Sequence, residues 1–180
     1  CLLGVTMDTG GGIQRGANWG PLFIRSVLEL NQYFDFGDVK TIPHLLHDKY
    51  LNEKTIKNCQ KSVYKNTENL PVSALSITED FCKDFYTHFP DKSLIGLGGD
   101  HSVSYALVKP WIKAKRKAGK RVAIIHFDAH TDLMSERLGI DICFGSWAYH
   151  MLELLEKPQH LIQFGIRSSG KPKKFWESSL

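Results

Sequence analysis

Two short segments of the chain hold residue types that bind metal ions or move protons. Asp128-Ala129-His130-Thr131-Asp132 places a carboxylate, an imidazole and a second carboxylate at alternate positions. In an extended backbone these three side chains point to the same side and form one patch. Carboxylate oxygen and imidazole nitrogen without thiolate suit Mn²⁺, and they tolerate Zn²⁺, Fe²⁺ or Co²⁺. The simpler alternative is a polar loop in which Asp128 or Asp132 caps the next helix.

The second segment is Gly-Gly-Asp-His-Ser at residues 98–102. Both segments follow apolar runs that read as strands. The carboxyl ends of parallel strands share one edge of a sheet, and open α/β sheets place their sites at that edge. His101 is therefore expected to face Asp128 from the neighbouring strand. Taken alone, His101 would read as a capping or core histidine, but two ligand-like clusters on one edge favour a metal site.

Apolar runs and helical segments alternate along the chain, and these elements must position the two clusters. Strands are expected at Leu2–Met7, Val39–Ile42, Ser93–Leu97, Val122–Phe127 and Leu161–Ile166, and helices at Leu22–Leu30, Lys54–Lys65, Ile77–His88, Ser102–Ala118 and Met151–Leu155. Pro110 is expected to break or kink the helix in which it lies. The alternation predicts an α/β fold with a parallel sheet covered by helices on both faces.

Composition excludes several classes of protein. The 180 residues are 42% hydrophobic and 23% charged, which is typical of one globular domain and excludes a disordered chain. No apolar run approaches the roughly 20 residues that span a bilayer, so no membrane partner is expected. The cysteines Cys1, Cys59, Cys82 and Cys143 form no C-x-x-C pair and indicate a reduced, cytoplasmic protein.

Two further features predict no nucleic-acid or nucleotide partner. The net charge of +4 is mild, and the basic run over residues 113–121 is typical of a solvated helix end. Gly10-Gly11-Gly12 follows a strand but lacks the Gly-Lys-Ser/Thr ending of a phosphate-binding loop.

In this order, the segments at 98–102 and 128–132 resemble the ureohydrolases: arginase, agmatinase, guanidinobutyrase and formimidoylglutamase. Residues 15–21 (Arg-Gly-Ala-Asn-Trp-Gly-Pro), followed by Ile24-Arg25, are similar to a stretch near the start of that family. The resemblance runs from about Leu3 to Arg167. It implies a three-layer α/β/α fold with a mostly parallel sheet, and a homo-oligomer, either trimer or hexamer.

The resemblance also implies a site with two Mn²⁺ ions. Its motifs assign His101 and Asp132 to one ion, His130 to the other and Asp128 to a bridge between them, while Asp100 supports the His101 loop from behind. The implied reaction hydrolyses a C–N bond of a linear guanidino or amidino compound, releasing a urea- or formamide-type product. A hydroxide bridging the two ions attacks the planar carbon. Asp128 and His130 are the expected catalytic residues.

The sequence departs from the family pattern in three places. The family's third motif, a D-x-D pair of metal ligands, is absent after Leu133, where Asp141 is the sole aspartate. Residues 1–180 are therefore expected to be one domain truncated before that motif, so the fold is expected to be incomplete. Phe144 stands where many members carry a proton-relaying histidine, and His150 is either its substitute or a helix-face residue. The loop over 133–141 lacks the asparagines of arginases, which argues against a standard arginase.

Two functions follow from these observations. The first is a manganese-dependent ureohydrolase acting on a small guanidino or amidino compound, and the intact His101, Asp128, His130 and Asp132 favour it. The alternative is a non-catalytic homologue that keeps the fold and acts as a binding or regulatory subunit, which Phe144 favours.

Overall fold

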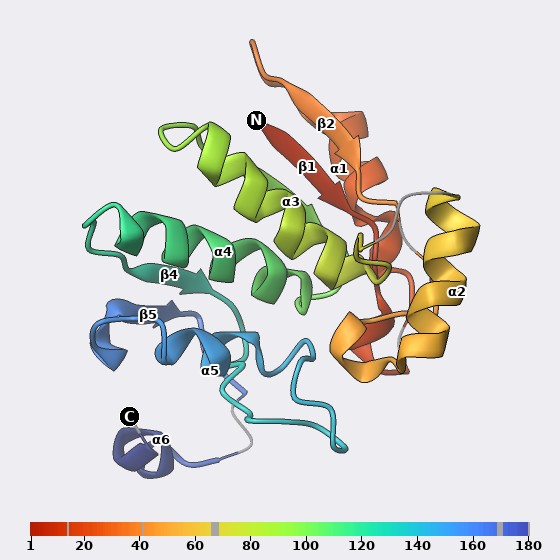
Figure 1. Cartoon of the computed structure of the whole chain (residues 1–180). Helices are drawn as coiled ribbons and strands as arrows, with labels where there is room; N and C mark the ends of the chain where they lie inside the picture. The colour runs from red at the N-terminus through yellow and green to blue at the C-terminus, as the bar shows by residue number, and fades with distance from the viewer. Residues whose placement is uncertain (14, 41, 66–68, 169–170, 180) are drawn as a thin grey trace.

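The strands of this protein pair in parallel, as the alternation of elements predicted. The computed structural model describes residues 1–13, 15–40, 42–65, 69–168 and 171–179 (Figure 1). The strands are β1 (Leu2–Val5), β2 (Asp35–Asp38), β3 (Ile95–Gly98), β4 (Ile124–Phe127) and β5 (Leu161–Phe164). The helices are α1 (Gly20–Val27), α2 (Glu53–Tyr64), α3 (Ala74–His88), α4 (Val103–Lys117), α5 (Trp147–Leu152) and α6 (Lys173–Ser179). None of the described helices has the length and apolar character needed to cross a bilayer.

The central strand of the larger sheet is β1. All four of its residues are buried, because Leu2, Leu3 and Val5 supply apolar side chains to both faces. The order of this sheet is β2–β1–β3, and Leu2 lies opposite Ile95 of β3. The second sheet pairs β4 with β5, with Ile124 opposite Leu161.

The expectation that β3 and β4 are neighbouring strands was wrong. Among the described residues β3 pairs with β1 and β4 with β5, and no ladder joins the two sheets. One face of the β4–β5 sheet is also uncovered. Phe127 is 78% exposed and stacks on Phe164 with 5.3 Å between ring centroids, while Ile125 and Ile162 are exposed beside them. The opposite face is covered, since Ile124 is buried.

Helices α3 and α4 lie side by side and enclose the main core (Figure 1). Leu75 of α3 and Ile112 of α4 are completely buried, and Met151 extends the core into α5. A local signal in the sequence sets the start of α2. Asn52 caps α2 by accepting a hydrogen bond from the backbone N–H of Thr55 at 2.9 Å.

Of the break or kink expected at Pro110, the break does not occur, since α4 is continuous from Val103 to Lys117. A proline inside a helix removes one backbone hydrogen bond and crowds the preceding turn. Here Pro110 is buried and α4 packs along α3, so tertiary packing outweighs that local penalty.

The expected strand over 39–42 was also misplaced, and Thr41 lies outside the described residues. The strand is β2, whose sequence Asp-Phe-Gly-Asp has little intrinsic preference for a strand. Arg25 of α1 stabilises this strand, since its guanidinium forms ion pairs with Asp35 at 2.8 Å and with Asp38 at 2.5 Å. The sequence also missed α6, and α5 begins four residues before the expected Met151.

The core predicts the response to truncation. Leu75 is 0% exposed and Leu138 is 95% exposed. We expect Leu75→Ala to lower the free energy of unfolding by about 2–5 kcal/mol, because it removes buried methyl groups and leaves a cavity. Leu138→Ala, the matched control, should change it by less than about 0.5 kcal/mol. Chemical denaturation measures both, and equal effects would contradict this placement of the core.

Candidate metal centre

His101 and two carboxylates converge where β3 and β4 end. The Nδ1 atom of His101 lies 3.0 Å from Asp128 Oδ2 and 2.8 Å from Asp132 Oδ2. With His126 added, one ligand atom from each residue lies within 4.8 Å of the others. The sequence predicted that His101 would face Asp128, and the two side chains do meet although β3 and β4 are not paired.

The loop that carries His101 is held against the end of β1. The backbone N–H of Gly99 donates to Val5 O at 2.9 Å, and that of Asp100 donates to Met7 O at 2.8 Å. A Cβ atom on Gly99 would lie 1.7 Å from Met7 O, so only glycine permits this approach. The double glycine of the sequence therefore fixes where His101 emerges.

Asp100 lies behind this loop and outside the metal cluster. Its Oδ1 accepts a hydrogen bond from the backbone N–H of Ser102 at 2.8 Å, at the start of α4. Burial raises the pKa of Asp100, although backbone N–H groups of Ser102, Gly10 and Gly11 oppose that shift. Asp100 thus ties the His101 loop to the turn at Thr9–Gly11.

The expected alternation of Asp128, His130 and Asp132 on one face of an extended chain was wrong. The strand ends at Phe127, and Asp132 has a φ of +50°, a left-handed conformation that turns the chain. The turn brings Asp132 into contact with His101. His130 instead has a 62% exposed side chain, and its Nδ1 lies 3.3 Å from Asp128 Oδ1.

The protonation states favour metal binding. Burial alone would raise the pKa of Asp128, but the backbone N–H of His130 and the rings of His101 and His126 lower it below its ordinary value. Burial lowers the pKa of His126, and the charge of His101 lowers it further, against the opposing effect of the carboxylates. At neutral pH Asp128 is therefore ionised, the state that a metal ligand requires, and His126 beside it is neutral.

The donor set and its spacing fit a divalent ion. Ligands on adjacent corners of an octahedron are about 3 Å apart when the metal–ligand bonds are about 2.1 Å long. The contacts from His101 Nδ1 to the two carboxylates match that spacing. No lysine or arginine among the described residues forms an ion pair with Asp128 or Asp132. A metal ion at this position would supply the missing positive charge.

His126 was missed by the sequence reading, although it continues the alternate spacing two residues before Asp128. Its Nδ1 atom lies 2.8 Å from the side-chain amide nitrogen of Gln163, which also donates to Thr131 O at 2.7 Å. A neutral ring that accepts at Nδ1 carries its proton on Nε2. That atom is 3.3 Å from Asp128 Oδ2, so His126 orients this carboxylate.

Trp147, at the start of α5, was also missed, and no pattern in the sequence pointed to it. Its indole N–H donates to Asp132 Oδ2 at 2.9 Å. Its ring centroid lies 5.1 Å from that of His101 and 5.0 Å from that of His126. Trp147 thus packs against the imidazoles while it fixes one carboxylate.

Phe144 and His150 both contact residues outside the metal cluster. The Phe144 ring lies 5.1 Å from the guanidinium carbon of Arg137. The Nε2 atom of His150 lies 2.7 Å from the carbonyl oxygen of Asp141, so His150 anchors the loop that leads to Trp147. Burial acts to raise the pKa of Asp141. Hydrogen bonds from Lys49 and Tyr50 to its carboxylate outweigh burial and lower the pKa to about 2.

Known structures share this arrangement of elements. Formimidoylglutamase from Bacillus subtilis superposes with a TM-score of 0.67 at 22% sequence identity, over 99% of this chain and 51% of that chain. Arginase from the same species superposes with a TM-score of 0.61 at 19% identity, over 99% and 59%. The fold is therefore the α/β fold of arginase-like proteins, and it is incomplete in this chain.

Sequence comparison defines the family. The Arginase family model matches residues 1–179, so the chain belongs to the arginase family. It is 29% identical to an agmatinase from Bacillus cereus, over 97% of this chain and 54% of that protein. It is 31% identical to the mitochondrial agmatinase of Gallus gallus, over 93% and 45%. The chain thus spans about half the length of the relatives it matches.

The contact between Trp147 and Asp132 predicts a metal-binding phenotype. We expect Trp147→Phe, in the full-length protein, to weaken Mn²⁺ binding about tenfold, because the ring remains but Asp132 loses its fixing donor. Tyr149→Phe removes one polar atom from the same helix and keeps the hydrogen bond from its backbone N–H to Asp132 O, so it should leave the affinity within twofold. Titration with Mn²⁺ measures both, and equal affinities in the two variants would contradict the role of the indole N–H.

Proposed function

We propose that the protein is a manganese-dependent hydrolase of a linear guanidino or amidino compound. The observation that carries this proposal is the convergence of His101, Asp128 and Asp132, with no lysine or arginine of the described residues paired to either carboxylate. Membership of the arginase family and similarity to agmatinases support it. A homo-oligomer, trimeric or hexameric, and a cytoplasmic location belong to the same proposal.

In this proposal His101 and Asp132 hold one Mn²⁺ ion, His130 holds the second, and Asp128 is shared. The contacts support the division, because Asp128 presents Oδ2 to His101 and Oδ1 to His130. When bound, the ions supply a water of lowered pKa and polarise the carbon under attack. Asp128 and His130 are the proposed catalytic residues, since Asp128 would be shared by the two ions and His130, with a 62% exposed side chain, lies beside it on the solvent side.

The other residues act through the ligands. Trp147 and His126 restrict the orientation of the two carboxylates, and Asp100 holds the His101 loop in place. The carboxylates also provide a negative field that attracts a cationic guanidinium.

We further propose that residues 1–180 belong to one domain whose remaining metal ligands lie elsewhere in the full protein. Two ions need more ligands than the four proposed here. No D-x-D pair occurs over residues 133–180, and the relatives are about twice as long as the matched region. The uncovered face of β4–β5 is consistent with further elements packing there.

A non-catalytic homologue, acting as a binding or regulatory subunit, is the second candidate. Phe144 cannot transfer a proton, and its ring is engaged by Arg137. His150, which could have replaced it, bonds the carbonyl of Asp141 instead. This candidate predicts metal binding without turnover.

Asp128→Asn tests the first candidate. We expect the variant of the full-length protein to lose Mn²⁺ and at least 100-fold of its activity, because the shared ligand is neutralised. Asp91→Asn, an exposed aspartate outside the cluster, is the matched control and should retain both. Elemental analysis after desalting measures the metal. Release of urea, ammonia or formamide from a panel of guanidino and amidino compounds measures the activity.

Three results distinguish the candidates. Metal and turnover lost together in Asp128→Asn support the hydrolase. Metal bound by the unaltered protein, with no turnover of any compound, supports the binding or regulatory subunit. Unchanged manganese content in Asp128→Asn would contradict both, because each assigns Asp128 to the metal.

A further inference from the structure

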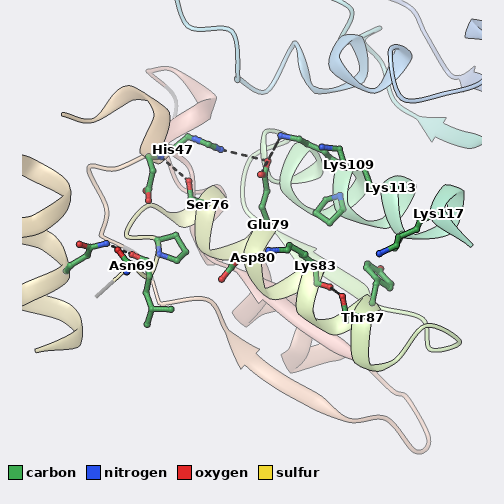
Figure 2. Close-up of a pocket in the computed structure, with 17 residues that line it drawn as sticks. His47, Asn69, Ser76, Glu79, Asp80, Lys83, Thr87, Lys109, Lys113 and Lys117 are labelled. Carbon is green, nitrogen blue, oxygen red and sulfur yellow. Dashed lines mark hydrogen bonds and ion pairs between the residues drawn. The ribbon is translucent and has the colours of Figure 1, made fainter. Parts of the chain in front are cut away.

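A cleft of about 940 Å³ lies along α3 and α4 (Figure 2). One wall comes from α3, with Glu79 and Lys83, and the other from α4, with Lys109, Lys113 and Lys117. The volume is within the range of small-molecule sites, roughly 300–1,000 Å³. No residue that lines the cleft belongs to the metal cluster.

Most acidic groups in the cleft are already committed. Glu79 accepts from Lys109 Nζ at 3.1 Å, and His47 Nε2 lies 3.8 Å away from the same oxygen (Figure 2). Asp48 accepts from the backbone N–H groups of Val72 and Ser73. Glu79 is therefore neutralised by Lys109, whereas Asp48 is held by neutral donors and keeps its negative charge. Four lysines and three carboxylates line the cleft, so its charge is positive by one.

Two lysines on α4 have no such partner. Lys113 and Lys117 line the cleft, and neither side chain forms an ion pair or hydrogen bond with the described residues. Their neighbours differ, since Lys115 donates to Pro90 O and Arg116 donates to Leu154 O, each at 2.6 Å. Like charges four residues apart on a helix repel one another. An anion between Lys113 and Lys117 would relieve that repulsion.

The positive end of the cleft also has a third ammonium and an apolar wall. Lys83 Nζ is held only loosely, 3.9 Å from Asp80. The buried ring of Pro110, the methyl group of Ala114 and the aromatic ring of Tyr86 line the cleft as well. A ligand with a negatively charged group and a flat apolar body would fit, because the ammonium groups would bind the charge and the apolar wall would contact the body.

We propose that this cleft binds a small organic phosphate, with the phosphate between Lys113 and Lys117 and an apolar body against Tyr86, Pro110 and Ala114. A phosphate fits better than a carboxylate. A phosphate monoester carries about two negative charges, one for each of the two lysines, whereas a carboxylate carries one. Lysine ammonium groups bind phosphate as point charges. The site is independent of the proposed hydrolase activity.

Phenyl phosphate is the probe, because it joins a phosphate to a flat apolar ring. Calorimetric titration of the full-length, metal-loaded protein should show one site that binds phenyl phosphate at least tenfold more tightly than inorganic phosphate. The double variant Lys113→Gln/Lys117→Gln should weaken the binding of phenyl phosphate at least tenfold. Lys120→Gln/Arg121→Gln removes the same charge from residues outside the cleft, and should weaken it less than twofold.

Each other outcome overturns the proposal. Unchanged affinity in Lys113→Gln/Lys117→Gln would place the phosphate elsewhere, including at the metal ions. Equal losses in the two double variants would mean attraction to overall charge. Equal affinity for phenyl phosphate and inorganic phosphate would mean that the apolar wall binds nothing. Circular dichroism of each variant, expected to match the unaltered protein, confirms that the fold is retained.

Discussion

The structure depends on holding two carboxylates beside one imidazole, with no lysine or arginine from the described part of the chain paired to them. Asp128 and Asp132 both approach Nδ1 of His101, and Asp132 is only 5% exposed on its side chain. The two carboxylates have oxygen atoms within 4.8 Å of each other, so their negative charges repel. Partial burial strengthens this repulsion because water screens it less. A protein keeps such an arrangement at a cost in stability, and a bound cation removes that cost. The need for a cation beside these carboxylates links the fold, which holds them together, to the proposed metal-dependent reaction.

The fold positions His101 and the two carboxylates through contacts between segments far apart in the sequence. Gly99 fits closely against Met7, so the end of β1 determines the position of His101. Trp147, from the start of α5, reaches Asp132. The contacts of His101, which follows β3, with Asp128 and Asp132, which follow β4, join the two sheets at the site, although no strand ladder connects the sheets among the described residues. The helix α4 starts beside this centre and carries, further along, the lysines of the phosphate cleft, so one helix contributes to two separate places of binding.

The sequence predicted the parallel α/β fold and the meeting of His101 with Asp128, because both follow from where apolar strands end. It could not predict that Asp132 reaches the cluster through a left-handed turn, since alternate spacing gives a direction only while the backbone stays extended. The role of Trp147 could not be predicted from local sequence, because its contact with Asp132 arises from tertiary packing. Pro110 shows the limit of local rules, since packing against α3 keeps α4 continuous.

The most direct test of the central claim is anomalous diffraction at the manganese edge from crystals of the full-length protein grown with Mn²⁺. The account predicts a peak within bonding distance, about 2.2 Å, of His101 Nδ1 and of carboxylate oxygens of Asp128 and Asp132. Proposed binding of the second ion by His130 would place another peak near Asp128 Oδ1. Manganese bound only elsewhere, or a lysine or arginine side chain placed between the two carboxylates, would contradict the account.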